Sequence, residues 1–538
     1  MKIFVFGIGG TGARVIRSLT MLMASGVEMP TGTTIVPIIV DCDLQNADTQ
    51  RTISILDTYK KVRYEAFNIN QKDAEYRENS FFNTPLTRLS DLQNDDNKKI
   101  KIGKEFHVAV EGADKTFGNY IGYDSLLTND TINLSLTKDF VASLYNDDTE
   151  SIGRELHLKL DKGFKGNPNI GAVIFEKWTE TNEFKFFEQC VEANDRIFII
   201  SSIFGGTGAA GFPKLVQAIK KSMRTETKNA LLAASVVMPY FKFVDDASSA
   251  ISESYFNSKT KAALNYYKTC RLNENFDALY YIGDKLDSTK GMYNNSEGGK
   301  SQKNDANYVE LLAATAIVDF ANKSERELKE SIRKAKDFGF KHDISDANID
   351  LRYFDGNSPD KGKFKFIDDL TRFAYFFRYF NEVLPKTSAS ASYVKVLGLE
   401  SDMPKTTFYK ELENFLNSTE SPFYSFGIWL AELIGNPMRK FNCYNINFLK
   451  NETGEYKKNG DSKMNEMLVE HDLKNGFLKK HLTDNDFNTW MNKELDKKDG
   501  TAKSDKQISA SIFMDIAYET MCEALKYALS TGKFNDFK

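Results

Sequence analysis

The sequence predicts an α/β protein whose core is a mostly parallel sheet with helices on both faces. Two observations lead to this prediction. Short, continuously apolar segments alternate along the chain with helical segments, as buried parallel strands alternate with the helices that connect them. Two of the apolar segments also run directly into glycine-rich turns, where α/β proteins hold ligands. We further expect a central core helix and a second, α+β, C-terminal domain.

The first forty residues predict a strand, a glycine turn, a helix and a second strand. Residues 2–6 are nearly all apolar, and residues 13–23 carry apolar side chains at helical spacing. The second strand covers residues 34–40. Residues 45–160 are mostly polar and show no dominant period, so we expect a largely helical insertion there.

The alternation of strands and helices returns after this insertion. We expect strands at 196–200, 231–238 and 277–283, and helices at 181–191, 213–223 and 247–267. Residues 307–320 have one broad apolar face with several alanines, which is typical of a buried central helix. The chain therefore divides into an N-terminal α/β domain (1–300), a core helix (301–323) and a C-terminal domain with a helical extension (324–538).

Composition excludes several classes of function. The 71 Lys and Arg residues nearly balance the 75 Asp and Glu residues, so no overall positive field attracts nucleic acid. The longest apolar runs are far shorter than the roughly 20 residues that span a bilayer, and the N-terminus lacks the pattern of a signal peptide. The cysteines and histidines lack metal-ligand spacing. We expect a cytoplasmic protein that neither binds nucleic acid nor spans a membrane.

Two glycine loops each follow a predicted strand and precede a predicted helix. The first contains Gly7, Gly9, Gly10, Thr11 and Gly12, and the second contains Gly205, Gly206, Thr207 and Gly208. Such a loop directs backbone N–H groups and a helix N-terminus toward an anion, and glycine lets phosphate oxygens come close. Neither loop carries the GK[ST] sequence of a P-loop. A tight structural turn is the simpler interpretation of one such loop, but two loops favour a phosphate site.

The first loop alone also fits a dinucleotide-binding fold. Glycines at positions 7, 9 and 12 have the required spacing, and Asp41 follows the next strand, where a ribose ligand is expected. An NAD-dependent Rossmann-type enzyme is therefore the alternative. That fold has no need of the second glycine loop, whereas a triphosphate held across several strand ends does.

The order of these segments resembles the tubulin and FtsZ superfamily of GTP-binding filament proteins. The segments that resemble its nucleotide loops are, in order, 7–12, 40–45 with Asp41 and Asp43, 163–171 with Gly166 and Asn167, 204–213, and 239–246 with Asp245. In that family an acidic residue of the fifth loop contacts the ribose, a role that falls here to Asp245. The resemblance covers roughly residues 1–45 and 160–322.

This resemblance implies a divergent bacterial tubulin-like protein whose residues 1–300 bind GTP or GDP. Mg²⁺ is expected with the phosphates and keeps most of its waters, so no side chain is assigned to the metal. An aromatic ring near the start of the family's core helix stacks on guanine. Tyr308 is therefore the candidate stacking residue, with Asn304 or Asn307 reading the base edge, although an aromatic ring at a helix start more often belongs to the core.

Two departures from the family leave hydrolysis open. The stretch between Asp43 and Gly163 is much longer than in a typical FtsZ. Filament-forming relatives supply an Asn-x-Asp-x-x-Asp/Glu loop to the next subunit, and the nearest match here is Asn348 and Asp350, with Tyr353 in place of the third acid. We expect a nucleotide-gated filament or scaffold that self-associates or binds protein partners, with weak or assembly-dependent GTP hydrolysis. Whether the chain is an enzyme stays open.

Overall fold

The computed structural model describes most of the chain. The residues outside the description are 44, 68–76, 95–99, 104–106, 110–111, 113, 127–131, 146–154, 165, 243–255, 285–297, 331–334, 338–347, 350–365, 389–390, 398–406, 419–423, 445–482, 499–505 and 531–538.

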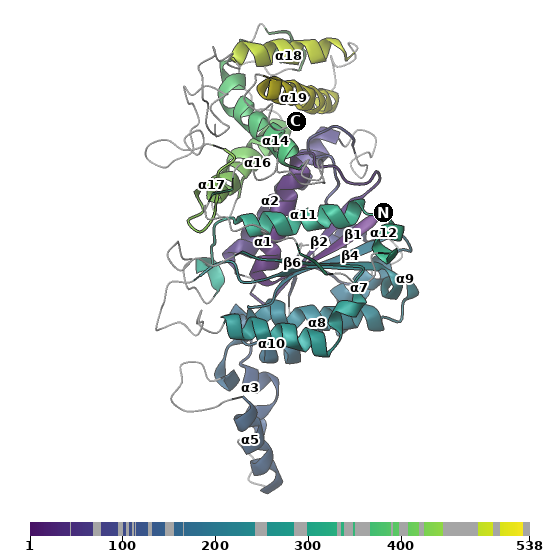
Figure 1. The fold of residues 1–538 in the computed structure, drawn as a ribbon, viewed down its shortest axis with the longest axis vertical. Helices are drawn as coiled ribbons and strands as arrows, with labels where there is room; N and C mark the ends of the chain where they lie inside the picture. The colour runs from purple at the N-terminus through teal and green to yellow at the C-terminus, as the bar shows by residue number, and fades with distance from the viewer. Residues whose placement is uncertain are drawn as a thin grey trace.

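A parallel sheet lies at the centre of the molecule (Figure 1). Within the described residues it has seven strands in the order β3-β2-β1-β4-β5-β6-β7. Its strands are β1 (Lys2–Ile8), β2 (Thr34–Asp41), β3 (His107–Ala109), β4 (Arg196–Ser202), β5 (Leu231–Val237), β6 (Ala278–Ile282) and β7 (Ala335–Asp337). Ile3 of β1 lies opposite Ile35 of β2 and Arg196 of β4. The five strands expected from the sequence are present. The edge strands β3 and β7 were not expected, because three residues are too few to show a periodic pattern.

Helices cover both faces of this sheet, which confirms the predicted fold class. Side chains alternate along β1, so that Ile3 and Val5 enter one hydrophobic cluster and Phe4 and Phe6 enter another. The first face carries α1 (Gly9–Ala24), α2 (Ala47–Phe67) and the core helix α11 (Tyr308–Asn322), and the second carries α6 (Pro168–Phe175), α7 (Asn182–Cys190), α8 (Gly206–Lys221) and α10 (Phe256–Thr269) (Figure 1).

The core helix α11 is fixed at both ends by side chains. Asn307 accepts a hydrogen bond from the backbone N–H of Val309 (2.9 Å), and Glu310 accepts one from the backbone N–H of Asn307 (3.2 Å), which forms a capping box. At the other end Arg196 donates to three carbonyl oxygens. Of the core helix expected over 301–323, residues 308–322 are therefore helical, and the helix begins only after this cap.

The glycine segments begin helices instead of preceding them. Helix α1 begins at Gly9 and α8 at Gly206, whereas the sequence predicted helices from residues 13 and 213. Pro213 consequently lies inside α8. The expected glycine loop over 163–171 likewise ends early, because α6 begins at Pro168. Glycine is a poor helix former, so the sequence pattern does not predict that a glycine-rich segment is the first turn of a helix.

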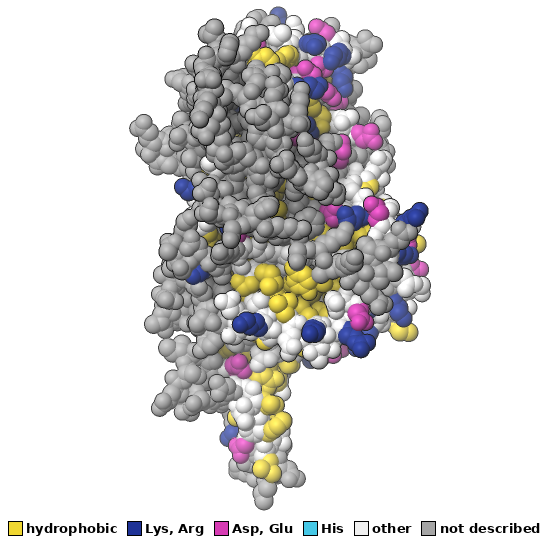
Figure 2. Space-filling model, viewed as in Figure 1, with side chains coloured by type: hydrophobic (Ala, Val, Ile, Leu, Met, Phe, Trp, Pro, Cys, Tyr) yellow, Lys and Arg dark blue, Asp and Glu magenta, His cyan; other side chains and the backbone are white. Residues whose placement is uncertain are grey.

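The insertion contributes more than separate helices. Helix α2 packs against α1, and β3 extends the main sheet. The described helices α3 (Phe117–Tyr120), α4 (Tyr123–Leu126) and α5 (Ile132–Leu144) form an arm that projects away from the sheet (Figure 1). Apolar side chains lie along this arm (Figure 2), and Leu136, Phe140 and Leu144 of α5 are each more than half exposed.

The described C-terminal residues are mainly helical. They form α12 (Glu325–Glu330), α14 (Phe366–Arg378), α15 (Ser392–Val396), α16 (Thr407–Asn417), α17 (Phe426–Gly435), α18 (Asp484–Asp496) and α19 (Lys506–Ser530), with a short parallel pair of β8 (Asn348–Ile349) and β9 (Lys440–Phe441). Helices α14, α16 and α19 pack against α1 or α2, so one hydrophobic core continues from the sheet into this region. None of the helices within the described ranges is long and apolar enough to cross a membrane.

Short elements connect these parts. They are α9 (Thr225–Asn229), the 3-10 helices η2 (Leu89–Leu92), η3 (Glu155–His157), η4 (Leu160–Lys162), η5 (Trp178–Glu180), η7 (Leu272–Asn275), η8 (Gly299–Ser301) and η10 (Leu384–Lys386), and the π-helical turn η9 (Tyr379–Val383).

Candidate functional site

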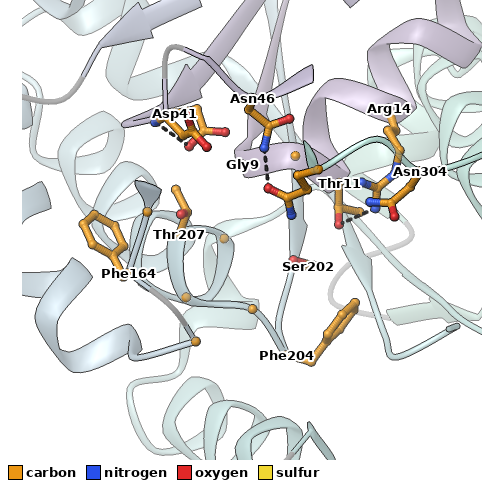
Figure 3. Close-up of a pocket in the computed structure, with 18 of the residues that line it drawn as sticks. Gly9, Thr11, Arg14, Asp41, Asn46, Phe164, Ser202, Phe204, Thr207 and Asn304 are labelled. Carbon is orange, nitrogen blue, oxygen red and sulfur yellow. Dashed lines mark hydrogen bonds between the residues drawn. The ribbon is translucent and has the colours of Figure 1, made fainter. Parts of the chain in front are cut away.

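The connections of the sheet change direction between β1 and β4. Strand β1 leads through α1, on the first face, to β2, whereas β4 leads through α8, on the second face, to β5 on the other side. Neighbouring strands whose connections diverge in this way leave a crevice at their carboxyl ends, where α/β proteins bind ligands. A cavity lies at this point (Figure 3).

Six segments of the chain line this cavity. They contribute Gly9, Gly10, Thr11 and Arg14; Asp41, Asp43 and Asn46; Gly163, Phe164 and Gly166; Ser202, Phe204, Gly205, Gly206, Thr207 and Gly208; Phe241; and Gln302 and Asn304. The described residues leave a cavity volume of about 130 Å³, below the ~300–1,000 Å³ of sites that hold a whole small ligand. The cavity therefore suits part of a ligand, such as its phosphate groups.

The first turns of α1 and α8 both line this cavity, and no described side chain caps either helix. Their N-cap residues are Ile8 and Gly205, and neither forms a side-chain capping bond. The first N–H groups of a helix have no partner within the helix and carry a partial positive charge. Two such helix starts at one cavity make a site for an anion.

Gly7 and Gly12 belong to the same motif but do not line the cavity. A Cβ atom on Gly12 would lie 2.4 Å from the carbonyl carbon of Gly7, and one on Gly7 would lie 2.6 Å from Cδ1 of Ile16. Both glycines therefore allow α1 to pack closely against β1. Their role is to place the first turn of α1 at the cavity.

Gly206 and Gly208 line the cavity and are also closely packed. A Cβ atom on Gly208 would lie 2.5 Å from the carbonyl oxygen of Ser202, and one on Gly206 would lie 2.9 Å from the backbone nitrogen of Gly166. The first turn of α8 is thus held against β4 and against the loop that contains Gly166. Any larger residue at these positions would push the backbone out of place.

Two buried carboxylates lie on the β2 side of the cavity. The backbone N–H of Asp43 donates to Asp41 (3.3 Å), and Asp43 accepts a hydrogen bond from the backbone N–H of Gly299 (2.6 Å). Burial, together with the nearby charge of Asp43, raises the pKa of Asp41 to about 7. Asp41 therefore changes its charge near neutral pH, directly beside the anion site.

Arg14 is the only cationic side chain among the described residues that line the cavity, and its charge is already compensated. Its Nε donates to Glu310 (2.6 Å) and its Nη1 to Asp48 (2.9 Å). Its Nη2 donates to the hydroxyl groups of Tyr240 (2.8 Å) and Thr11 (3.3 Å). The guanidinium group therefore fixes the walls of the cavity and adds no net positive charge.

Asp48 is the centre of a buried polar cluster beside the cavity. Besides Arg14, it accepts hydrogen bonds from the backbone and side-chain nitrogens of Asn304 (3.1–3.3 Å), and Arg17 lies 3.5 Å away. All these side chains are buried. Asn304 thus lines the cavity while its amide nitrogen is bonded to Asp48.

The polar cluster continues through α2 to α17. Arg51 donates to the carbonyl oxygen of Asn304 (3.3 Å) and forms an ion pair with Glu432. Glu432 also accepts hydrogen bonds from the hydroxyl group of Tyr424 (2.5 Å) and the backbone N–H of Ala306 (3.1 Å). The ion pair between Arg51 and Glu432 therefore connects one wall of the cavity to the C-terminal helix α17.

The structure brings most of the predicted site residues together. Those that line the cavity are Gly9, Gly10, Thr11, Asp41, Asp43, Gly166, Gly205, Gly206, Thr207, Gly208 and Asn304, and those that do not are Gly7, Gly12, Asn167, Asn307 and Tyr308. Asn167 precedes α6 as its N-cap residue. Asp245 and Asp350 lie outside the described residues, and only the backbone of Asn348 is described, in β8.

Tyr308, the candidate stacking residue, lies in the core. Its side chain is fully buried, and its ring stacks on Phe441 with the ring centroids 5.9 Å apart. Asn307, one of the two candidates for reading the base, instead caps α11. The start of the core helix is therefore packed against C-terminal residues and is not open to the cavity.

The lining residues that were not among the predicted site residues are Arg14, Asn46, Gly163, Phe164, Ser202, Phe204, Phe241 and Gln302. Asn46 accepts hydrogen bonds from the backbone N–H groups of Asp48 (3.0 Å) and Thr49 (3.2 Å), and it donates to Gln302 (2.6 Å). An asparagine just before a helix is a readable N-cap pattern. No sequence pattern marks Gln302, because only the folded structure brings it next to Asn46.

The fold and the cavity together define an α/β protein with two uncapped helix starts at the point where its sheet connections diverge. No protein-family model and no curated protein matches the sequence. Among solved structures, the chain is similar to CetZ2 from Haloferax volcanii in a GTPγS-bound protofilament, with 13% identity and a TM-score of 0.30 over 62% of this chain and 63% of that chain.

Two further structures show similarity of the same order. A tryptophan-to-tyrosine mutant of FtsZ from M. jannaschii has 16% identity and a TM-score of 0.23, over 52% of this chain and 46% of that chain. TubZ from Clostridium botulinum phage c-st has 14% identity and a TM-score of 0.25, over 64% and 71%. The chain thus spans less than two thirds of the CetZ2 and FtsZ chains.

Proposed function

We propose that this chain is a tubulin/FtsZ-like protein that binds the phosphates of GTP or GDP between α1 and α8. The observation that supports the proposal most is the pair of uncapped helix starts at the cavity. A dinucleotide-binding enzyme needs one such helix start after its first strand, whereas this cavity has two, from opposite faces of the sheet.

The residues of the cavity fit a phosphate chain. Backbone N–H groups in the first turns of α1 and α8 would bind the phosphate oxygens, and the hydroxyl group of Thr207 would add a further donor. Asp41 and Asp43 line the same cavity, and the charge of Arg14 is compensated, so the side chains that line it leave most of a triphosphate's charge unbalanced. We therefore expect Mg²⁺ to accompany the nucleotide and to supply that compensation.

Direct binding measurements test this proposal. The purified protein should bind GTP and GDP more tightly than ATP or NAD in isothermal titration calorimetry with Mg²⁺ present. The variant Thr207→Val should bind GTP more weakly, and the variant Thr225→Val, changed at an exposed site outside the cavity, should bind like the original protein. Preference for NAD would refute the proposal and favour the Rossmann-type alternative.

We also propose that the protein self-associates as a nucleotide-gated filament or scaffold, with weak or assembly-dependent GTP hydrolysis. The ordered resemblance of five segments to the filament-forming superfamily motivates this part. Sedimentation and negative-stain microscopy with GTP, with GDP and without nucleotide test it, since a nucleotide-gated polymer should appear with GTP. Phosphate release by the variants Asn348→Ala and Asp350→Ala then tests these two residues as catalytic candidates, because loss of release with unchanged binding would support them.

A further inference from the structure

The cavity lacks a free positive charge in the part of the chain that the structure describes. Its lining includes two carboxylates, Asp41 and Asp43, and one cation, Arg14. The guanidinium group of Arg14 is bonded to the carboxylates of Asp48 and Glu310. A polyphosphate bound here would gain from any further cation close to the lining, because Coulomb attraction is strong where water is excluded.

Lys259 of α10 provides such a cation beside Gly166. A Cβ atom on Gly166 would lie 2.9 Å from Nζ of Lys259. The ammonium group therefore occupies the space in which any other residue at position 166 would place its side chain. Gly166 itself lines the cavity with φ of +77°. The ammonium group thus lies next to a residue that lines the cavity.

The first turn of α8 lies on another side of the same glycine. A Cβ atom on Gly206 would lie 2.9 Å from the backbone nitrogen of Gly166. The first turn of α8 and the ammonium group of Lys259 therefore both lie next to Gly166. A lysine side chain has a flexible four-carbon stem, so a small rotation can bring its Nζ to such an anion.

Lys259 lies in a partly buried position near the carboxylate of Glu155. Its side chain is half-buried, and burial lowers the pKa of its ammonium group, an effect that the charge of Glu155 partly offsets. Glu155 accepts a hydrogen bond from Asn169 (3.4 Å), in the first turn of α6, which follows the Gly166 loop. An ammonium group with incomplete solvation binds an anion at a lower desolvation cost than one in open water.

We propose that Lys259 is a phosphate-binding residue that makes the affinity of the site depend on the number of phosphates in the nucleotide. This inference rests on the proposed function, because it assigns a further contact to the same ligand. Attraction between Lys259 and the ligand grows with the ligand's charge. The lysine therefore strengthens the binding of GTP more than that of GDP.

Three variants test this role, with binding of GTPγS and GDP measured by calorimetry at several salt concentrations. Lys259→Met keeps the length of the side chain but removes its charge, and it should weaken GTPγS binding about tenfold and GDP binding less. Its affinity should also fall less steeply with salt. Lys259→Arg keeps the charge and should restore most of the affinity and of the salt dependence. Lys261→Met, at an exposed site on the same helix, is the matched control and should bind like the original protein.

The outcomes separate this inference from the proposed function. If the original protein binds no guanine nucleotide, both fail. If it binds GTPγS and Lys259→Met has the same affinity ratio and the same salt dependence, only the role of Lys259 is refuted. A thermal unfolding midpoint close to that of the original protein shows that a weakened variant is folded, so that the loss belongs to the binding site.

Discussion

Replacing Asp41 with asparagine should make the unliganded protein more stable above neutral pH. The folded protein keeps a proton on Asp41 up to a pKa of about 7, compared with 3.8 for an ordinary aspartate. Between these values the folded state binds more protons than the unfolded chain, so the free energy of unfolding falls as pH rises. The difference of about three pH units corresponds to about 4 kcal/mol at pH 8. The introduced asparagine would be neutral at every pH, and its side-chain oxygen would still accept the hydrogen bond from the backbone N–H of Asp43.

Urea unfolding at pH 5, 6, 7 and 8, without nucleotide, measures this effect. The original protein should lose stability across this range relative to Asp41→Asn, and the variant should be the more stable of the two at pH 8 by up to about 4 kcal/mol. Asp161→Asn, changed at an exposed aspartate, is the control and should follow the original protein. Parallel pH profiles for Asp41→Asn and the original protein would show that Asp41 is ionised in the folded state throughout, which contradicts the reasoning.

Three further predictions concern close packing and buried charge. Gly12→Ala should lower the free energy of unfolding by about 1–3 kcal/mol, because its Cβ would overlap the backbone of Gly7, whereas Gly10→Ala, with no atom of the surroundings closer than 3.7 Å, should be tolerated. Asp48→Ala should cost about 3–5 kcal/mol in the same measurement, since the buried Arg17 loses the carboxylate with which it is paired and Arg14 keeps only Glu310. Tyr308→Leu should lower the free energy of unfolding by about 1–3 kcal/mol, because the ring is buried against Phe441, but it should keep the affinity for GTP. Weaker GTP binding at unchanged stability would instead support a role of Tyr308 in stacking on the base.

The strands were predictable because parallel strands buried on both faces are continuous apolar runs. The cavity was predictable in outline for the same reason, since glycine loops that follow such strands meet at one edge of the sheet. Gly9 and Gly206 were assigned to turns although they begin helices. Glycine has a low helix propensity, so the sequence pattern does not predict it at a helix start. For Gly206, close packing against neighbouring backbone explains why glycine is present.

Other parts of the site depend on contacts between distant segments, which no local pattern carries. The sequence already favoured a core position over a stacking role for Tyr308, but only the contact of its ring with Phe441 decides between them. Lys259 is one of several lysines on a polar helix, and its position beside Gly166 follows from the crossing of α10 past the loop. Burial of Arg14 is likewise visible only once its carboxylate partners are in place.

The continuous hydrophobic core has a consequence for how this chain can be divided. Trp429 of α17 donates a hydrogen bond to Ser18 of α1 (3.3 Å), and the ring of Tyr424 covers the guanidinium group of Arg17 at 4.5 Å. A shortened protein ending at residue 323 would expose the surface of α1 that α17 contacts. It would also leave the buried guanidinium group of Arg17 without the ring of Tyr424. We therefore do not expect the first 323 residues to fold as an independent domain. A change in the C-terminal helices that face α1 can therefore shift the helix whose first turn lines the cavity, so both parts of the chain have to be kept together when it is engineered.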